Sequence, residues 1–212
     1  MKLDDGHREY ARAALDEASV DADPFRQCRV WLDEAMSAIP EGFNIMTLAT
    51  VSPEGAPDAR TVLLKSLEAD GLVFYTDYRS PKAAHLAANP SACLLFFWGG
   101  LERQVRVTGD VARLSAEDSA AYFSTRPRGS QLGAWASHQS AVLAGGRPEL
   151  EEALRTVESR VGDGPVPLPS HWGGYLLRPS AFEFWQGRVN RLHDRIRYRR
   201  TDGSWVLERL SP

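Results

Sequence analysis

The sequence has few of the residues that would place this chain in a secreted, membrane or metal-binding class. It contains only two cysteines among 212 residues, Cys28 and Cys93, far apart and without a CxxC spacing. Two isolated thiols argue against a disulfide framework and a cysteine-based zinc site, and they are typical of a reducing cytosol. The N-terminus lacks the apolar segment of a signal peptide, and no run approaches the ~20 apolar residues of a membrane span. We therefore expect a soluble, cytoplasmic protein.

The signatures of several common enzyme classes are also absent. No GxGxxG or GxxxxGK[ST] motif occurs, so neither a Rossmann dinucleotide site nor a P-loop is indicated. The five histidines show no HExxH spacing, and there is no GxSxG elbow. Hydrolase and metalloenzyme functions thus lack support from motifs, and no metal site is expected. The formal net charge of −3 also disfavours a nucleic-acid-binding module.

What the chain does contain is a regular series of short strand-like runs. Hydrophobic residues make up 43% of the sequence and charged residues 25%, which suits a globular protein with a sizeable core. Runs rich in β-branched and aromatic residues, separated by turn residues, predict strands near 44–51, 59–67, 71–77, 92–98, 103–114, 173–186, 191–200 and 204–210. Strands in such quick succession predict a largely antiparallel sheet that closes into a barrel. The expected fold class is therefore α+β, mainly β.

Helices are expected at four places between these strands. Apolar residues recur at helical spacing over 25–39, and Ser80-Pro81 has the residues of a helix start for a segment that Asn89-Pro90 ends. Ser115 with Asp118 resembles a capping box, and 148–161 is amphipathic. Residues 1–23 are charged and show no strong apolar period, so we expect a flexible arm followed by a single domain, 24–212.

The stretch "FWQGRVNRLHDRIRYRR" (184–200) packs six arginines and one histidine into a chain that is acidic overall. If 191–199 form a strand, Arg191, His193, Arg195, Arg197 and Arg199 share one face. Guanidinium groups bind phosphate through paired hydrogen bonds and stack on flat π-systems, so a phosphorylated aromatic ligand would use both properties. The plain alternative is a solvated strand face, which Arg197 and Arg199 near the hairpin turn fit best.

Similar groups recur elsewhere and favour ligand binding. "RTVLLK" has a cation at each end, Arg60 and Lys65, and "YTDYRSPK" places hydroxyls and Lys82 at a strand-to-helix junction that suits an anion. Two further segments contribute Tyr122, Arg126 and Ser130, and Gln139 and Ser140. Together these groups suggest two phosphate sites. Arg60 and Lys65 are five residues apart, so a flat strand would put them on opposite faces unless a bulge or a shared interface intervenes.

These segments carry a family resemblance. "RTVLLK", "YFSTRPRGSQLGAWASHQS", "VPLPSHWGGY" and "RLHDRIRY" resemble the pyridoxamine 5′-phosphate oxidase family, with a match from about residue 24 to the C-terminus. The resemblance implies an FMN-binding split β-barrel with flanking helices that works as a homodimer, with FMN at the subunit interface. It also implies oxidation of pyridoxamine or pyridoxine 5′-phosphate to pyridoxal 5′-phosphate, with O2 as acceptor and H2O2 as product.

The resemblance also assigns roles to residues. The implied FMN contacts are Arg60, Thr61, Val62, Leu63, Leu64, Lys65, Tyr75, Thr76, Lys82, Gln104, Gln139, Ser140, Trp185 and Arg195. The implied substrate-phosphate contacts are Lys65, Tyr122, Arg126 and Ser130. Arg191 and His193 would lie against the pyridine ring as the catalytic residues, and the arm segment with Arg8 and Tyr10 would cover the site.

The chain departs from the family pattern at three places, and two other functions compete with the oxidase. Pro81 stands where the family usually has a basic residue, Arg188-Val189 where it commonly has Gly-Glu, and His7 where many members have arginine. One alternative is a split-barrel flavin oxidase acting on a phenazine-type aromatic, for which a phosphate-binding set would have no use. The other is a non-catalytic protein that binds FMN or pyridoxal phosphate, against which the presence of Arg191 and His193 argues.

Overall fold

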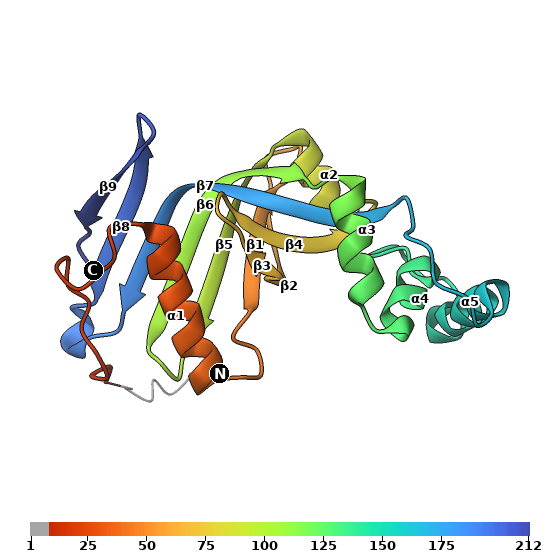
Figure 1. Cartoon of the computed structure of the whole chain (residues 1–212), viewed down its shortest axis with the longest axis horizontal. Helices are drawn as coiled ribbons and strands as arrows, with labels where there is room; N and C mark the ends of the chain where they lie inside the picture. Colours follow the sequence, from red (N-terminus) through yellow and green to blue (C-terminus); the bar gives the residue numbers. More distant parts are fainter. Residues whose placement is uncertain (1–8) are drawn as a thin grey trace.

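The computed structural model describes residues 9–212, and its centre is one curled antiparallel sheet (Figure 1). The described elements are α1 (Pro24–Ala38), β1 (Ile45–Val51), β2 (Pro57–Leu63), β3 (Ser66–Leu67), β4 (Leu72–Asp77), α2 (Pro81–Ala88), β5 (Ser91–Trp98), β6 (Arg103–Arg113), α3 (Ala116–Thr125), α4 (Arg128–Ala136), α5 (Gly146–Val161), β7 (Trp172–Gln186), the 3₁₀ turn η1 (Val189–Arg191), β8 (Asp194–Thr201) and β9 (Ser204–Arg209). The predicted α+β class and split-barrel architecture are confirmed.

The sheet is organised around the long strand β7. The strand order is β2-β1-β5-β6-β7-β4-β3, and β8 and β9 continue from β7 as a hairpin. β7 pairs with β6 along most of its length, with β4 at its start and with β8 at its end. A register shift between Thr108 and Gly109 of β6 bends this pairing, as a β-bulge does. One strand thus links the helical end of the molecule to the β8–β9 hairpin.

The core lies between the curled sheet and α1. Asp23 caps the first turn of α1, and the apolar face of that helix buries Cys28, Trp31 and Ala35. Trp31 meets Phe184 of β7 edge-on, with the two ring centroids 5.2 Å apart. Each large side chain buried in this way contributes about 1.5–3 kcal/mol to the free energy of unfolding. The helix predicted over 25–39 is therefore confirmed.

A second, smaller apolar cluster holds three helices together at the far end of β7. It contains Phe123 of α3, Leu132 of α4, Val157 of α5 and Trp172 at the start of β7. The helix start predicted at Ser115 is confirmed, because the Ser115 hydroxyl accepts from the backbone N–H of Asp118. The Asp118 carboxylate accepts from the Ser115 hydroxyl, whereas in a full capping box it would accept from the Ser115 backbone N–H. α4 has no counterpart among the helices predicted from sequence.

The strand predicted over 191–200 begins later than expected. η1 precedes it, and Asn190 and Arg191 have φ angles of 55° and 61°, in the left-handed region. Strand β8 begins only at Asp194, so the prediction that Arg191 and His193 share a strand face with Arg195 is wrong. The cause is local: left-handed residues cannot continue a β-ladder.

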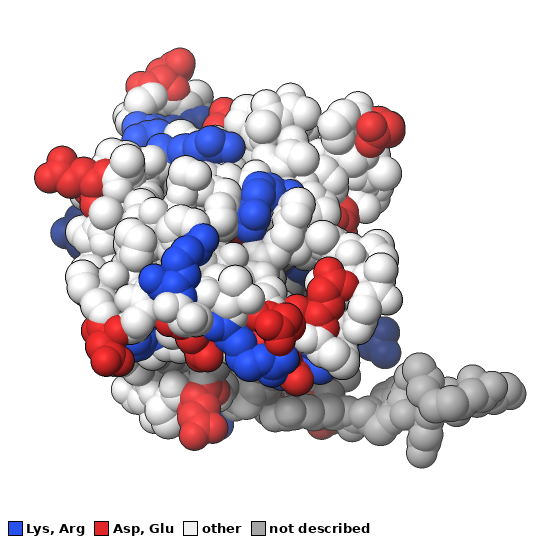
Figure 2. Space-filling model, turned by 90° about the vertical axis from the view of Figure 1, so that its right-hand side faces the viewer, with Lys and Arg blue, Asp and Glu red and all other residues white. Residues whose placement is uncertain are grey.

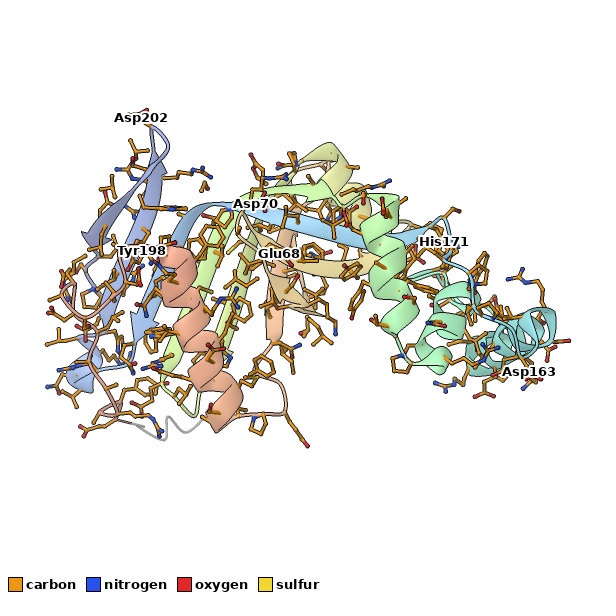
Figure 3. All side chains as sticks on the ribbon, viewed as in Figure 1. Glu68, Asp70, Asp163, His171, Tyr198 and Asp202 are labelled. Carbon is orange, nitrogen blue, oxygen red and sulfur yellow. The ribbon has the colours of Figure 1, made fainter. Side chains whose placement is uncertain are left out.

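The described part of the N-terminal segment, residues 9–23, is tied to the hairpin end of the sheet. Leu15 is buried, and its backbone N–H donates to Asp194 at 3.0 Å. Tyr198 points from β8 towards the start of α1, and its hydroxyl donates to the carbonyl of Asp21 at 2.6 Å (Figure 3). The predicted sites at His7 and Arg8 lie outside the described residues. The boundary between arm and domain at residue 23 stays a prediction.

Candidate active site

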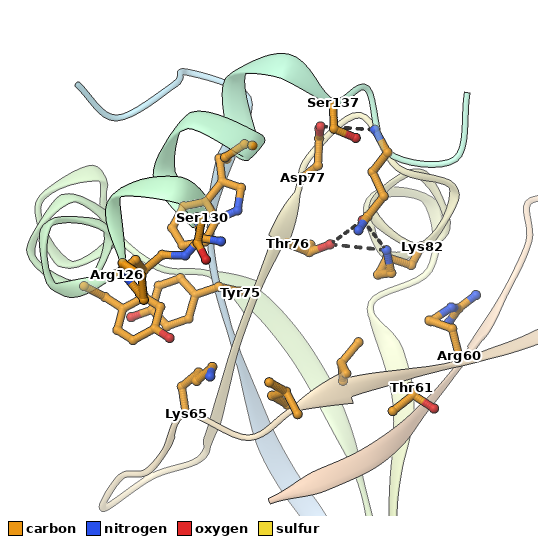
Figure 4. A pocket seen from close by; sticks show the side chains of 18 of the residues that line it. Arg60, Thr61, Lys65, Tyr75, Thr76, Asp77, Lys82, Arg126, Ser130 and Ser137 are labelled. Atoms are coloured by element: carbon orange, nitrogen blue, oxygen red, sulfur yellow. Dashed lines mark hydrogen bonds between the residues drawn. The ribbon is translucent and has the colours of Figure 1, made fainter. Parts of the chain in front are cut away.

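A cleft of about 860 Å³ opens beside the β2 and β4 edge of the sheet, facing α2, α3 and α4 (Figure 4). Thirteen of the residues predicted as ligand contacts line it: Arg60, Thr61, Val62, Leu63, Lys65, Tyr75, Thr76, Lys82, Tyr122, Arg126, Ser130, Gln139 and Ser140. Leu64 does not, because its side chain is buried in the main core. The segments that carry these thirteen residues thus converge on one cavity, whereas the basic stretch 184–200 does not line it.

A change of strand partner explains how Arg60 and Lys65 reach the same cleft. The ladder between β2 and β1 ends at Leu63, and the backbone N–H of Leu64 donates to the carbonyl of Asn44. The next N–H, from Lys65, donates instead to Val73 of β4. The chain therefore leaves one strand and joins another between 64 and 65, which breaks the alternation of faces that a flat strand would impose.

One end of the cleft holds Lys82 in a compact polar group. Its ammonium donates to the Gln139 Oε1 at 2.6 Å and to the Thr76 hydroxyl at 3.2 Å, and the same hydroxyl donates to Gln139 at 2.9 Å. Burial, and then the positive charge of Arg60, lower the pKa of Lys82 to about 8. Two cations held together in a poorly solvated place create a site that favours an anion.

The loop that carries Gln139 is fixed by Asp77 and Arg79. The Arg79 guanidinium donates to both Asp77 oxygens and, at 2.8 Å, to the carbonyl of Ser137. Burial pushes the pKa of Asp77 upwards, but the hydrogen bonds from Arg79 outweigh it, and the pKa lies below its ordinary value. Asp77 therefore stays ionised and anchors the loop. Sequence reasoning missed this pair, although it lies inside the "YTDYRSPK" segment.

The other end of the cleft is an aromatic stack with an arginine on it. The rings of Tyr75 and Tyr122 stack with centroids 4.0 Å apart, and Trp172 stacks on Tyr75 at 5.3 Å. The Arg126 guanidinium lies 4.5 Å from the Trp172 ring centroid. Its Nη1 is buried and makes no hydrogen bond. A buried guanidinium nitrogen without an acceptor is costly, so it indicates the place of an anionic ligand.

A second group of predicted residues lies at the opposite end of β7. Gln104 pairs across the ladder with Trp185, and Trp185 pairs with Arg195. Tyr10 packs edge-on against both Trp185 and His193, with centroids 5.7 and 5.9 Å apart. A Cβ on Gly187 would lie 2.6 Å from the Tyr10 ring, so only glycine permits this approach. These residues do not line the cleft in the same chain.

The cationic face of β8 is neutralised by acids that the sequence analysis did not consider. Arg195 donates to Glu183 at 2.9 Å and to the carbonyl of Ser211 at 2.8 Å, and Glu183 also pairs with Arg106. Glu183 is 5% exposed. Arg197 and Arg199 both bind Glu208. Glu183 lies directly across the β7–β8 ladder from Arg197 and diagonally from Arg195. These positions follow from strand register, which sequence alone does not give.

Several alternative chemistries receive no support from the described residues. Within 9–212, no group of three or more His, Cys, Asp and Glu side chains could hold a metal ion. Among the described helices, none is long and apolar enough to cross a membrane. On the face at the helical end of the molecule, basic and acidic side chains are interspersed and form no continuous basic tract (Figure 2). This face does not resemble a nucleic-acid-binding surface.

Comparisons with known proteins give matches over nearly the whole chain. The family model described as "Pyridoxamine 5'-phosphate oxidase" matches residues 32–159, and that of the "Pyridoxine 5'-phosphate oxidase C-terminal dimerisation region" matches residues 172–212. A pyridoxine/pyridoxamine 5′-phosphate oxidase from Salinibacter ruber is 56% identical over 100% of this chain and 99% of its own. A protein of the same name from Pseudomonas paraeruginosa is 50% identical with the same coverage.

Two solved structures show the same architecture. PhzG from Burkholderia lata 383, in complex with tetrahydrophenazine-1-carboxylic acid, superposes with a TM-score of 0.88 at 25% identity, covering 96% of this chain and 100% of its own. A pyridoxamine 5′-phosphate oxidase-related, FMN-binding protein from Nostoc punctiforme superposes with a TM-score of 0.73 at 21% identity, covering 91% and 100%. The similarity to the Nostoc punctiforme protein, at 21% identity, shows the fold alone.

Proposed function

Because this chain belongs to the pyridoxamine 5′-phosphate oxidase family, we infer that its cleft holds FMN and oxidises pyridoxamine or pyridoxine 5′-phosphate to pyridoxal 5′-phosphate. O2 is the electron acceptor and H2O2 the second product; with pyridoxamine 5′-phosphate, water is also consumed and ammonia released. The observation that carries this inference is the pair of anion-binding ends in one cleft, one at Arg60 and Lys82 and the other at Arg126. A flavin phosphate and a substrate phosphate account for both.

The residues present fit the cofactor. Arg60, Lys82, Gln139 and Ser140 are placed to bind the FMN phosphate, and the run from Thr61 to Leu63 lines the wall between the two ends. Bound FMN supplies the redox chemistry by accepting a hydride from the substrate. The lowered pKa of Lys82 supports this assignment, since an ionised phosphate would restore the charged form of the buried ammonium.

The substrate phosphate is assigned to Lys65, Tyr122, Arg126 and Ser130. The unsatisfied Nη1 of Arg126 would gain an acceptor, and the stacked tyrosines offer a flat, apolar wall. We assign Arg191 and His193 to the pyridine ring, where Arg191 would hold the ring by its planar guanidinium and His193 would orient it. Tyr10 would close the site over His193.

The protein works as a homodimer, and the length of β7 supports a flavin site shared between the two subunits. Trp172 lines the cleft at one end of this 15-residue strand, while Trp185 and Arg195 lie at the other end. The two ends are about 40 Å apart along an extended chain. Residues on both ends can surround one flavin only if the second group comes from the partner subunit. The match of 172–212 to a dimerisation region supports this arrangement.

A phenazine-type substrate is the second candidate, because PhzG shares the fold over nearly the whole chain. The unsatisfied Arg126 favours a phosphorylated substrate instead, since an aromatic carboxylic acid carries its charge on a carboxylate bonded directly to the ring and has no separate phosphate for this site. A cytoplasmic location is part of the same proposal and is supported by two cysteines that form no disulfide.

The direct test is anaerobic mixing of the FMN-loaded protein with pyridoxine 5′-phosphate. We expect the flavin absorbance to bleach and to return when O2 is admitted. A flavin that stays oxidised with pyridoxine and pyridoxamine phosphates but bleaches with a dihydrophenazine acid would favour the second candidate. Sedimentation of the same sample should show a dimer.

A further inference from the structure

The guanidinium of Arg60 is held in place from the side of β1. Its Nη1 donates to the carbonyl of Leu48 at 2.9 Å and to the hydroxyl of Thr50 at 2.7 Å, while Nη2 pairs with Asp58 at 2.5 Å. Thr50 is 2% exposed. Arg60 lines the cleft, so these bonds determine how its charge is presented there.

Thr50 connects Arg60 to His85, a histidine that has no part in the proposed function. The Thr50 hydroxyl oxygen lies 3.0 Å from Nδ1 of His85, near the C-terminal end of α2. A guanidinium only donates, so the hydroxyl oxygen accepts from Arg60 and its own proton is available for His85 Nδ1. The neutral imidazole then carries its proton on Nε2. Protonation of Nδ1 reverses this bond, and the oxygen can still accept from Arg60 through its other lone pair.

We propose that His85 is a positioning residue for Arg60: through Thr50 it holds the guanidinium at the cleft, and its protonation strengthens FMN binding. The proposal rests on the proposed function, because it takes the anion at Arg60 to be the FMN phosphate. His85 does not line the cleft.

The charges around His85 determine the direction of the effect. Lys82 lies on the same helix, Arg60 and Asp58 on β2, and Glu54 on the turn between β1 and β2. Asp58 and Glu54 interact electrostatically with His85, and hydrogen bonds hold the pKa of each below its ordinary value. Both acids are therefore ionised at neutral pH and their charge does not change there. A protonated His85 adds positive charge behind Arg60, which tightens binding of a phosphate.

The test is titration of the apoprotein with FMN, followed by quenching of flavin fluorescence, at about pH 6 and about pH 7.5. His85→Gln retains an acceptor for Thr50 but cannot titrate, so its Kd should match wild type at the higher pH. The ratio of its Kd to that of wild type should rise about three- to tenfold at the lower pH. Taking the ratio at each pH cancels the titration of the phosphate itself. With riboflavin, which has no phosphate, the ratio of the two Kd values should be the same at both pH values.

Two further variants test the path through Thr50. His85→Leu removes the acceptor for the Thr50 hydroxyl. It should weaken FMN binding about threefold even at pH 7.5, because one hydrogen bond that holds Thr50 is lost. In a Thr50→Val background, His85→Leu should not weaken FMN binding any further. If the two substitutions weakened FMN binding additively, His85 would not act through Thr50, and the proposal would be overturned. Ala84→Gln, at an exposed position of α2, is the matched control and should leave Kd unchanged at both pH values.

A Kd ratio for His85→Gln that does not change with pH overturns the proposal. Failure of the wild-type protein to bind FMN overturns the proposed function and this inference together. If the wild-type protein binds FMN but the Kd ratio is the same at both pH values, only this inference is overturned.

Discussion

The backbone N–H of Arg188 donates to Nδ1 of His193 at 3.1 Å, which fixes the tautomer of a predicted catalytic histidine. A nitrogen that accepts this bond carries no proton, so the neutral ring has its proton on Nε2. Burial, and then the positive charge of Arg191, lower the pKa of His193 below its ordinary value. The resting site therefore holds a neutral imidazole with a defined donor.

We predict that the His193 imidazole titrates below pH 6.5, its ordinary value, and that Arg191→Ala moves the titration upwards. A histidine whose pKa is lowered on folding contributes stability that is lost as the pH falls, and protonation here also removes the bond from Arg188. Imidazole NMR of the labelled protein, with His193→Asn to assign the signal, gives the value. If the pKa of His193 were unchanged in Arg191→Ala, the charge of Arg191 would not be a cause of the lowered pKa.

A second prediction separates Arg191 from Arg195. Arg191→Ala should leave FMN bound and slow flavin reduction by substrate, and Arg191→Lys should rescue poorly because an ammonium has no planar face. Arg195→Ala should loosen the flavin and cost about 1–3 kcal/mol of stability, because buried Glu183 loses a partner. Stopped-flow reduction, FMN titration and thermal unfolding distinguish the two. Wild-type reduction rates in Arg191→Ala would contradict its role at the ring.

The sequence predicted most of the sheet because its signals are local. Alternating apolar residues and turn residues lie within each strand, and the helix over 25–39 has a full apolar face. α4 was missed because "RGSQLGAWA" contains two glycines and no side-chain cap, and its stability comes from packing of Leu132 in the second cluster. Tertiary contact, not propensity, makes it a helix.

The sequence indicated which residues belong to the candidate site, but not how they are arranged in space. The residues around Arg60 and Arg126 could be found because anion binding requires particular side chains in quantity. Two features could not be read from the residues alone. One is the partner change at Lys65, and the other is the left-handed turn before Asp194, which removes Arg191 from the β8 face. Both depend on which strands meet, and that is a property of the whole sheet.

A third prediction concerns Arg126. Because its Nη1 is buried without a partner, Arg126→Met should leave the thermal stability of the apoprotein unchanged or higher. The same change should raise the KM for pyridoxine 5′-phosphate about 10- to 150-fold, because it removes a charge-assisted bond worth about 1.5–3 kcal/mol. Activity towards unphosphorylated pyridoxine should change little. A large loss of stability in the apoprotein would show that Arg126 is structural.

The fourth prediction restores a charge that the family has and this chain lacks. Pro81 is the first residue of α2 and is exposed, next to Lys82. Pro81→Arg should tighten FMN binding by about 1–3 kcal/mol at most. Pro81→Gln controls for loss of the proline, which should cost about 0.4–1 kcal/mol of stability in both variants. Equal FMN affinity in the two variants would mean that the added charge does not reach the phosphate.

The last prediction uses the two opposite effects of Lys82 on stability and binding. Burial and Arg60 lower the pKa of Lys82 from 10.5 to about 8, so between these values the unfolded chain binds one more proton than the folded chain. The free energy of unfolding of the apoprotein should therefore rise as the pH increases from 8 to 10.5, the reverse of what a lysine with a stabilising anion would give. FMN affinity should fall over the same range, because the phosphate needs the ammonium. Lys82→Met should abolish both trends, and Lys65→Met, which changes an exposed cation at the other end of the cleft, should preserve them. Denaturant unfolding and FMN titration at matched pH values measure the two trends. If stability and affinity fell together above pH 8, the buried ammonium would not be the group that titrates.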